Sequence, residues 1–560
     1  MFKKWNENWQ VWKEDNAFRL IFSVPEDAIT VDLPYDAAFH RPQSIDSPNQ
    51  GHTGFLDGGV FNYYKEYYAD PKERGQTVKL LFEGVMGRAS VYVNGSLAGE
   101  NDYAYSEFCV DIGAWLKYGE VNQILVMVNA MDLSSRYYCG AGICRDVYLI
   151  RQGDVRVEAE SLRCTTLDIE ENTAVLRIET DIINDRAGMI DGFEEIAVRG
   201  RAGEVCREVV KLNLPARSKV HLSRRLAVES IVPWDEYTPE LYEVTIDVNG
   251  LDFAGITTGF RTLSLDAKHG LRVNGKPVKL RGACIHHDQG LLGAATFDGW
   301  EFYRVSRLKA AGFNAVRCAH NPASKALLRA CDRLGVYVMD EAFDMWARMK
   351  NPQDYAMFFT RGWRGVLDAM VRVDYSHPSV ILYSTGNEIT EVGTEKGYQL
   401  SHAMTEHLHR LDPTRFVTNG INGVFAAGNR LIMAFQQITG EEAPAAMRGD
   451  INECMSALGP HMGEVVRHDE ISDILDHLEP TMDVLGYNYM TGRYEMDCSQ
   501  HANRVIIGTE TYPRQIAENW EIIERNPAVL GDFTWTGWDY LGETGRRENF
   551  QVPDRKSTRL

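Results

Sequence analysis

The sequence predicts a multidomain protein in which two β-sandwiches precede a C-terminal (β/α)8 TIM barrel. At 560 residues the chain is too long for one compact core, so several cores must pack side by side. Residues 1 to about 265 carry strand patterns with little helical periodicity. After about residue 266, apolar strands alternate with amphipathic helices, a pattern that indicates a parallel sheet.

The first domain, residues 1–153, is predicted as a β-sandwich. A hairpin is expected over residues 89–99, where Asn94-Gly95 supplies the positive φ angles that a tight two-residue turn requires. Alternating apolar residues over 123–128 continue the strand pattern.

The second domain, residues 154–265, is predicted as an immunoglobulin-like β-sandwich. Short strands such as 173–179 and 241–247 recur at the spacing of a small sandwich. No cluster of ionisable residues stands out here, so we expect a spacer between the other two domains.

The third domain, residues 266–553, is predicted as the TIM barrel. One helix between the second and third strands is expected to begin after Ser324 and to end at Gly335. Eight strand units match such a barrel, although no closing helix follows the eighth. The predicted strands are 279–286, 313–319, 337–342, 380–388, 416–421, 484–489, 505–510 and 532–538.

The two ends of the chain carry further indications. The N-terminus, Met1 to Glu7, becomes polar at once, and no stretch is long enough to span a bilayer. We therefore expect a cytoplasmic protein with no membrane partner. Residues 554–560 read like a translated sequencing adapter, so we expect a non-native tail and a longer natural protein.

Composition narrows the classes of partner. The formal net charge of −20 argues against nucleic acid, because an acidic surface repels polyphosphate. Ten cysteines occur singly, without a CxxC pair, which favours reduced thiols over disulfides or zinc. We expect no cofactor, and the composition leaves a homo-oligomer open.

Polar side chains lie at the C-terminal ends of the predicted barrel strands, which is the end of the barrel where barrel enzymes have their active sites. The fourth strand is apolar until Asn387 and Glu388, and the seventh ends in Glu510. Because these strands lie roughly across the mouth, the two carboxylates can flank one glycosidic bond, one protonating the leaving oxygen and the other attacking the anomeric carbon. The other strand ends carry His286, His287, Asp288, Arg317, His320, Asp340, Glu341, Asn488, Tyr489 and Trp535 to Asp539.

Two other classes of site stay open at this point. His286, His287 and Asp288 could be ligands of a barrel metallohydrolase, although their spacing is irregular and a metal-content measurement would decide. A non-catalytic carbohydrate-binding pseudoenzyme predicts the loss of one carboxylate, and both are present.

Four short phrases along the chain form a specific set. The first domain contains Gly-Ala-Gly-Ile-Cys-Arg-Asp-Val-Tyr-Leu at 140–149, and the barrel contains Phe-Asn-Ala-Val-Arg-Cys-Ala-His-Asn-Pro at 313–322. His-Pro-Ser-Val at 377–380 then leads into Gly-Asn-Glu at 386–388. With these phrases the sequence resembles glycoside hydrolase family 2, which includes β-galactosidases, β-glucuronidases and β-mannosidases, over nearly the whole chain. The resemblance implies that the first domain is a jelly roll.

The resemblance also implies roles for the two carboxylates. Glu388 looks like the acid/base, Glu510 like the nucleophile, and Asn387 like the residue that binds the 2-hydroxyl of the sugar. Arg317 looks like the positioner of the nucleophile. We expect Arg317 to keep Glu510 ionised and apolar surroundings to keep Glu388 protonated.

The remaining predicted site residues would bind the sugar. Tyr489 looks like a hydrogen-bond partner of the nucleophile, and Asn488 lies at the same strand end. By the resemblance His286 and His320 bracket the sugar, while Trp535 forms an apolar wall. The substrate is expected to be a small β-glycoside; β-galactosidase is the first choice and β-glucuronidase the alternative.

Overall fold

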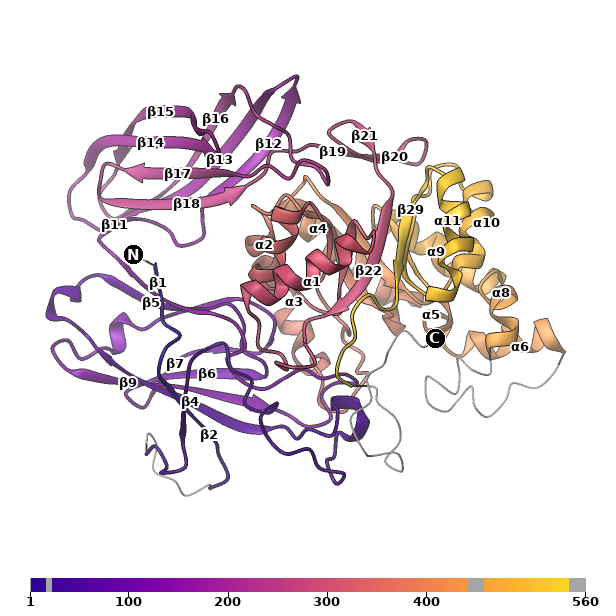
Figure 1. Ribbon diagram of the computed structural model, residues 1–560, viewed down its shortest axis with the longest axis horizontal. Coiled ribbons are helices and arrows are strands. Elements are labelled where there is room, and N and C mark those ends of the chain that lie inside the picture. The colour runs from indigo at the N-terminus through magenta and orange to yellow at the C-terminus, as the bar shows by residue number, and fades with distance from the viewer. Residues whose placement is uncertain (1, 17–22, 441–457, 543–560) are drawn as a thin grey trace.

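The computed structural model describes residues 2–16, 23–440 and 458–542, and it confirms a multidomain fold that ends in a barrel (Figure 1). Both sandwiches lie on one side of the barrel, at the left in this view. The predicted tail 554–560 and the end of the predicted third domain lie outside the described residues.

Two antiparallel sheets form the first sandwich. Apolar side chains, among them Trp9, Phe61 and Tyr63, are buried in one cluster. The predicted turn is confirmed, since φ is 49° at Asn94 and 87° at Gly95. One sheet has the order β1 (Phe2–Lys4), β10 (Val147–Gln152), β5 (Thr77–Phe82) and β8 (Phe108–Asp111), and the other β3 (Ile29–Val31), β2 (Trp9–Lys13), β4 (Gly59–Tyr68), β9 (Val121–Ala130), β6 (Arg88–Val93) and β7 (Ser96–Asn101).

The second sandwich has its own core, in which the inward residues of long alternating strands are buried. A small sheet then leads into the barrel. The first sheet contains β11 (Val155–Val157), β12 (Arg163–Glu170), β13 (Thr173–Asn184) and β16 (Ser218–Val228); the second contains β14 (Ile190–Gly200), β15 (Gly203–Leu214), β17 (Tyr242–Val248) and β18 (Asp252–Thr258); the small sheet contains β19 (Leu263–Asp266), β20 (Gly270–Val273) and β21 (Lys276–Pro277).

Eight parallel strands close the barrel, because the first strand pairs with both the second and the eighth. Their residues are almost all buried, as expected when one face fills the barrel and the other contacts helices. The strands are β22 (Leu280–His286), β23 (Ala315–Ala319), β24 (Tyr337–Glu341), β25 (Val380–Asn387), β26 (Phe416–Ile421), β27 (Leu485–Asn488), β28 (Ile506–Thr511) and β29 (Val529–Thr534).

The eighth predicted strand, 532–538, was placed too late in the chain. β29 ends at Thr534, and the backbone after it bonds to the two strands that flank β29, which are β28 and β22. The Trp535 N–H donates to the Thr511 carbonyl at 2.8 Å, and the Gly537 N–H donates to the Cys284 carbonyl at 3.0 Å.

The helix predicted between the second and third strands is confirmed. The Ser324 hydroxyl accepts a hydrogen bond from the Leu327 N–H, and Gly335 ends the helix with φ 65°. The helices are α1 (Asp298–Ala310), α2 (Lys325–Leu334), α3 (Ala356–Asp374), α4 (Glu395–Leu411), α5 (Gly423–Ala427), α6 (Arg430–Thr439), α8 (Met462–Val465), α9 (Asp469–Leu478), α10 (Tyr494–Gln500) and α11 (Ile516–Arg525).

Buried arginines hold both sandwiches against the barrel. Arg145 of the first sandwich donates to the carbonyls of Pro322 and Ala323, at 3.0 and 3.2 Å. Arg261, which follows the second sandwich, donates to the Pro378 carbonyl at 2.6 Å. These donors satisfy loop carbonyls that no strand or helix pairs.

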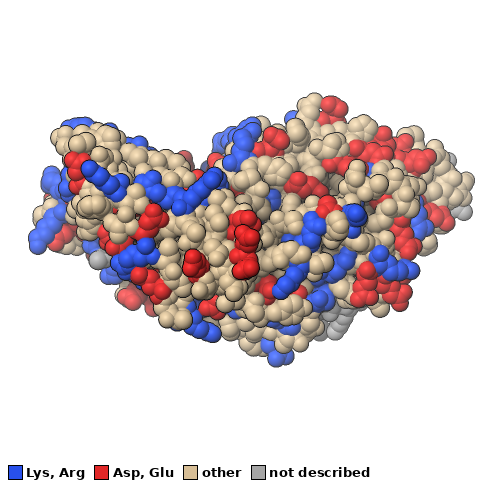
Figure 2. All heavy atoms as spheres, turned by 90° about the horizontal axis from the view of Figure 1, so that it is seen from above, with Lys and Arg blue, Asp and Glu red and all other residues tan. Residues whose placement is uncertain are grey.

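The surface mixes charges of both signs. Figure 2 shows acidic and basic side chains interspersed over one face of the molecule. Within the described ranges, no helix combines the length and the apolar character that crossing a bilayer requires.

The barrel interior gives the first prediction. A Cβ added at Gly486 of β27 would lie 2.4 Å from the Asn419 carbonyl oxygen and 2.6 Å from Thr509 Cγ2. Gly486→Ala should therefore lower the free energy of unfolding by about 1–3 kcal/mol. Gly365→Ala, at an open and exposed position of α3, is the control and should be neutral or stabilising by up to ~1 kcal/mol. Equal denaturation midpoints for both variants would contradict this account.

Candidate active site

The nine side chains predicted for the site all lie at the C-terminal end of the barrel. Eight of them are at most 5% exposed, and only Tyr489 is partly exposed. They come from β22 (His286), β23 and its end (Arg317, His320), β25 and its end (Asn387, Glu388), β27 and its end (Asn488, Tyr489), β28 (Glu510) and the segment after β29 (Trp535).

Three donors orient the carboxylate of Glu510. The Arg317 guanidinium donates to Oε2 at 3.0 Å, and the Asn488 amide donates to the same oxygen at 3.3 Å. The Tyr489 hydroxyl donates to Oε1. The backbone of Tyr489 is itself held at φ 57° by an N–H bond to the Glu510 carbonyl, so the donor and the carboxylate are fixed together.

The charge state of Glu510 differs from the expectation. Burial and the negative charge of Glu388 raise the pKa of Glu510 to about 7, outweighing the lowering by Arg317 and Tyr489. Arg317 alone therefore does not keep Glu510 fully ionised at neutral pH. Because the two carboxylates interact, their protons leave in steps that belong to the pair.

Glu388 follows β25 with a left-handed backbone. Its φ is 45°, and its N–H donates to the Gly420 carbonyl at 2.7 Å, which fixes this unfavourable conformation. The Asn422 amide donates to its Oε1 at 2.8 Å, and Arg136 Nη2 lies 3.7 Å from its Oε2. The apolar surroundings expected for Glu388 are therefore wrong, since a cation and an amide face its carboxylate.

Arg317 also fixes Asn387 through a buried network. Arg317 donates to both oxygens of Glu341, at 2.8 to 3.1 Å, and to Asn387 Oδ1 at 2.9 Å. Asn387 Nδ2 donates to Asp344 Oδ1 at 3.0 Å. With its oxygen and one N–H engaged, the amide of Asn387 has one orientation and one N–H left to offer.

An aromatic wall closes another side of the site. The His320 ring stacks on Trp535 with centroids 5.2 Å apart, and His286 meets Trp535 edge-on at 5.3 Å and stacks on Tyr540 at 4.0 Å. His320 Nδ1 lies 2.8 Å from Glu341 Oε1. Burial lowers the pKa of both imidazoles well below their usual value, so the wall is uncharged at neutral pH.

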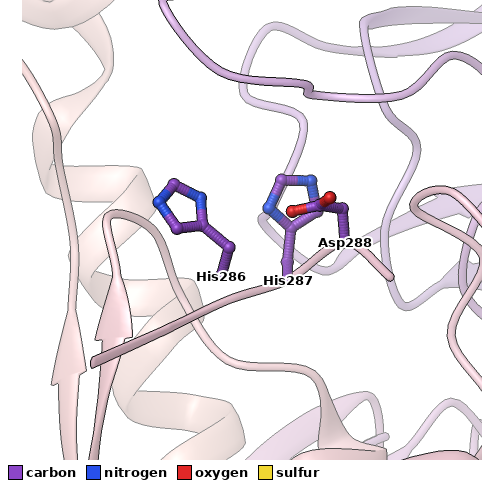
Figure 3. Close-up of side chains that lie close together, drawn as sticks. All are labelled: His286, His287 and Asp288. Carbon is purple, nitrogen blue, oxygen red and sulfur yellow. The ribbon is translucent and has the colours of Figure 1, made fainter. Parts of the chain in front are cut away.

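The alternative metal site concerns three neighbours at the end of β22. Figure 3 shows His286, His287 and Asp288 side by side there, and one potential ligand atom from each lies within 4.8 Å of the others. His286 packs in the aromatic wall against Trp535 and Tyr540. Asp288 accepts a hydrogen bond at 2.7 Å from the Leu541 N–H, in the chain after β29. Burial raises the pKa of Asp288 to about 7, so much of it is protonated near neutral pH and a poor ligand.

Several contributors were not among the predicted site residues. Glu341 stood among the polar strand ends but carried no role, although it accepts three bonds from Arg317. Asn422 and Asp344 follow strands β26 and β24, and their position just past a strand end was the available signal. Arg136 belongs to the first sandwich, and no sequence pattern points from there to the barrel.

Comparisons with known proteins find relatives that match most of the chain. Residues 266–439 match the family model described as glycosyl hydrolases family 2, TIM barrel domain. A β-galactosidase of Bacteroides ovatus is 30% identical over 92% of this chain, and a β-glucuronidase of Bacteroides fragilis is 24% identical over 96%. Two crystal structures of glycosyl hydrolase family 2 members from Bacteroides cellulosilyticus match 97% of this chain at 31% identity, with TM-scores of 0.83 and 0.80.

These relatives are longer than the chain. The chain spans 64% of the B. ovatus protein and 75% of the B. fragilis protein. It spans 66% and 67% of the chains in the two crystal structures.

The raised pKa of Glu510 makes stability depend on pH. The folded state binds this proton more tightly than the unfolded chain, whose Glu titrates at the ordinary 4.5. The resulting stabilisation is present below about pH 4.5 and is lost as the pH rises through about 7. Glu510→Gln, which cannot ionise, should gain up to about 3 kcal/mol of unfolding free energy relative to the wild type between about pH 5 and about pH 8.

Denaturation midpoints at the two pH values measure this gain. Glu521→Gln, at an exposed position of α11, is the matched control and should differ from the wild type equally at both. A Glu510→Gln difference that does not change with pH would refute the shift.

Proposed function

Because the chain belongs to glycoside hydrolase family 2, we propose that it hydrolyses terminal β-linked sugars by double displacement with retention of configuration. The observation that carries this proposal is the pair of buried carboxylates at one barrel mouth, each with different partners. Glu510 faces Arg317 and Tyr489, as suits a nucleophile, while Glu388 faces Asn422 and Arg136. We assign Glu510 as nucleophile and Glu388 as acid/base.

In the first step, a carboxylate oxygen of Glu510 attacks the anomeric carbon. The bond between that carbon and the leaving oxygen breaks, and Glu388 gives its proton to the leaving oxygen. Arg317 donates to one oxygen of Glu510 and Tyr489 to the other, so the two donors fix the orientation of the carboxylate. The products of this step are a covalent glycosyl-enzyme and the free aglycone.

In the second step, Glu388, now a carboxylate, takes a proton from water. The water oxygen bonds to the anomeric carbon, and the ester bond to Glu510 breaks. Arg317 and Tyr489 then stabilise the carboxylate that departs, because both donors already point at its oxygens. The sugar leaves with its original anomeric configuration.

The remaining residues suit recognition of one sugar ring. The free N–H of Asn387 can donate to the 2-hydroxyl, where hydrogen bonds strengthen as oxocarbenium character develops. The neutral rings of His286 and His320 and the face of Trp535 offer an uncharged wall for a sugar face.

We propose galactose as the sugar, with glucuronate as the alternative. Among the residues that the structure describes, three cations at the mouth face protein carboxylates: Arg317 faces Glu341 and Glu510, and both Lys350 and Arg136 face Asp344. A glucuronate carboxylate would need a cation of its own. The higher identity to a β-galactosidase than to a β-glucuronidase also favours galactose.

Chemical rescue tests the assignment of the two carboxylates. Glu388→Ala should still form the glycosyl-enzyme from a dinitrophenyl β-galactoside, because this aglycone leaves without a proton, and should then stall. Azide should restore its turnover and give the β-galactosyl azide, while Glu510→Gln should lose turnover of every substrate. Glu395→Ala, an exposed residue at the start of α4, should turn over normally and ignore azide. If azide rescued neither of these two variants, the assignment of Glu388 and Glu510 would have to be reopened.

A substrate panel tests the sugar. Nitrophenyl β-galactoside should be hydrolysed with a kcat/KM at least about tenfold above that for nitrophenyl β-glucuronide, since a buried carboxylate without a partner cation costs more than about 1.4 kcal/mol. A preference for the glucuronide would overturn galactose and leave the double displacement standing.

A further inference from the structure

One segment of the first sandwich lies in the barrel mouth. This segment, residues 135–139, follows β9 and is anchored there by the Tyr138 N–H, which donates to the Leu541 carbonyl at 3.1 Å. The Tyr137 ring meets His286 edge-on with centroids 4.6 Å apart. Arg136 directly precedes these two anchors, and its side chain is 18% exposed.

Arg136 stands in a row of alternating charges. Its Nη2 lies 3.4 Å from Asp344 Oδ1 and 3.7 Å from Glu388 Oε2. Lys350 donates to the same Asp344 oxygen at 2.9 Å and to the Asn387 carbonyl at 2.8 Å. The row therefore runs Lys350, Asp344, Arg136, Glu388, and it crosses from the barrel to the sandwich and back.

We propose that Arg136 is a positioning residue for acid/base chemistry: the first sandwich supplies the cation that stabilises the Glu388 carboxylate. This inference rests on the proposed function. Glu388 becomes negative when it protonates the leaving group, so a nearby cation favours this proton transfer, and it stabilises the carboxylate with which the second step begins. Asp344 holds Arg136 in place without displacing it from Glu388.

Glu510 shares the mouth with Glu388, and burial together with the negative charge of Glu388 raises the pKa of Glu510. Burial would raise the pKa of Asp344, but Lys350 and Arg136 hold it well below its usual range, so Asp344 stays charged. The charged and titratable groups around Glu388 are Arg136 from the sandwich, Arg317 and His320 from β23 and its end, Asp344 and Lys350 after β24, Tyr489 after β27, and Glu510 and Tyr512 from β28 and its end.

The test is the pH dependence of kcat/KM with a nitrophenyl β-galactoside. In Arg136→Gln the carboxylate pair should keep its last proton to higher pH, so the alkaline limb should move up by about one pH unit. Arg136→Lys should restore most of this shift. Arg88→Gln, which removes a sandwich cation that contacts Phe358 of the barrel and Asp102 but no site carboxylate, should leave the limb in place.

A rate loss that is equal at every pH, with the limb unmoved, would overturn the proposal in favour of a purely structural role. A second measurement needs no turnover: the midpoint of thermal unfolding at about pH 8 in a double-mutant cycle of Arg136→Gln and Glu388→Gln. The loss caused by Arg136→Gln should be smaller in the Glu388→Gln background; equal losses would also overturn the proposal.

Failure of the proposed function would look different. If the wild type hydrolysed none of the glycosides, both the proposed function and the role of Arg136 would fall. Hydrolysis with an unmoved limb would overturn the role of Arg136 alone.

Discussion

The buried guanidinium of Arg317 is the interaction on which the mouth of the barrel depends. Its side chain is fully buried, and a buried charge is tolerated only when its donors are satisfied. Glu341, Asn387 and Glu510 supply those acceptors from three different strands. The same bonds that make burial of Arg317 possible therefore set the orientation of the residues that would meet the substrate.

Much of the fold could be predicted because local pattern and global structure agree. Ser324 and Gly335 mark the ends of α2 for purely local reasons, a side-chain cap and a positive φ. The eighth strand was misplaced because Trp535 and Trp538 extend its apolar run beyond Thr534, where β29 ends. A run of apolar residues indicates that the residues are buried, but burial alone does not show where a strand ends.

The sequence could predict where the nine side chains lie, but not the charge of the carboxylates. A strand that is apolar until Glu510 predicts where its carboxylate lies. The pKa of that carboxylate is raised by burial and by Glu388, which is far away in sequence and close in space. Arg136 was missed for a related reason: it belongs to a domain that the pattern separates from the barrel, and it lies 208 positions before Asp344.

The seam where the barrel closes joins three segments that are distant in sequence. The end of β22 contacts the chain after β29 through His286 with Tyr540 and Asp288 with Leu541, and Tyr138 of the sandwich bonds to the same Leu541. Each segment presents groups whose partners lie on the other two. Recombination that exchanged one of these loops with a relative would leave buried donors and acceptors unmatched. A change to the pocket at this seam therefore requires matched substitutions in the sandwich and in both ends of the barrel.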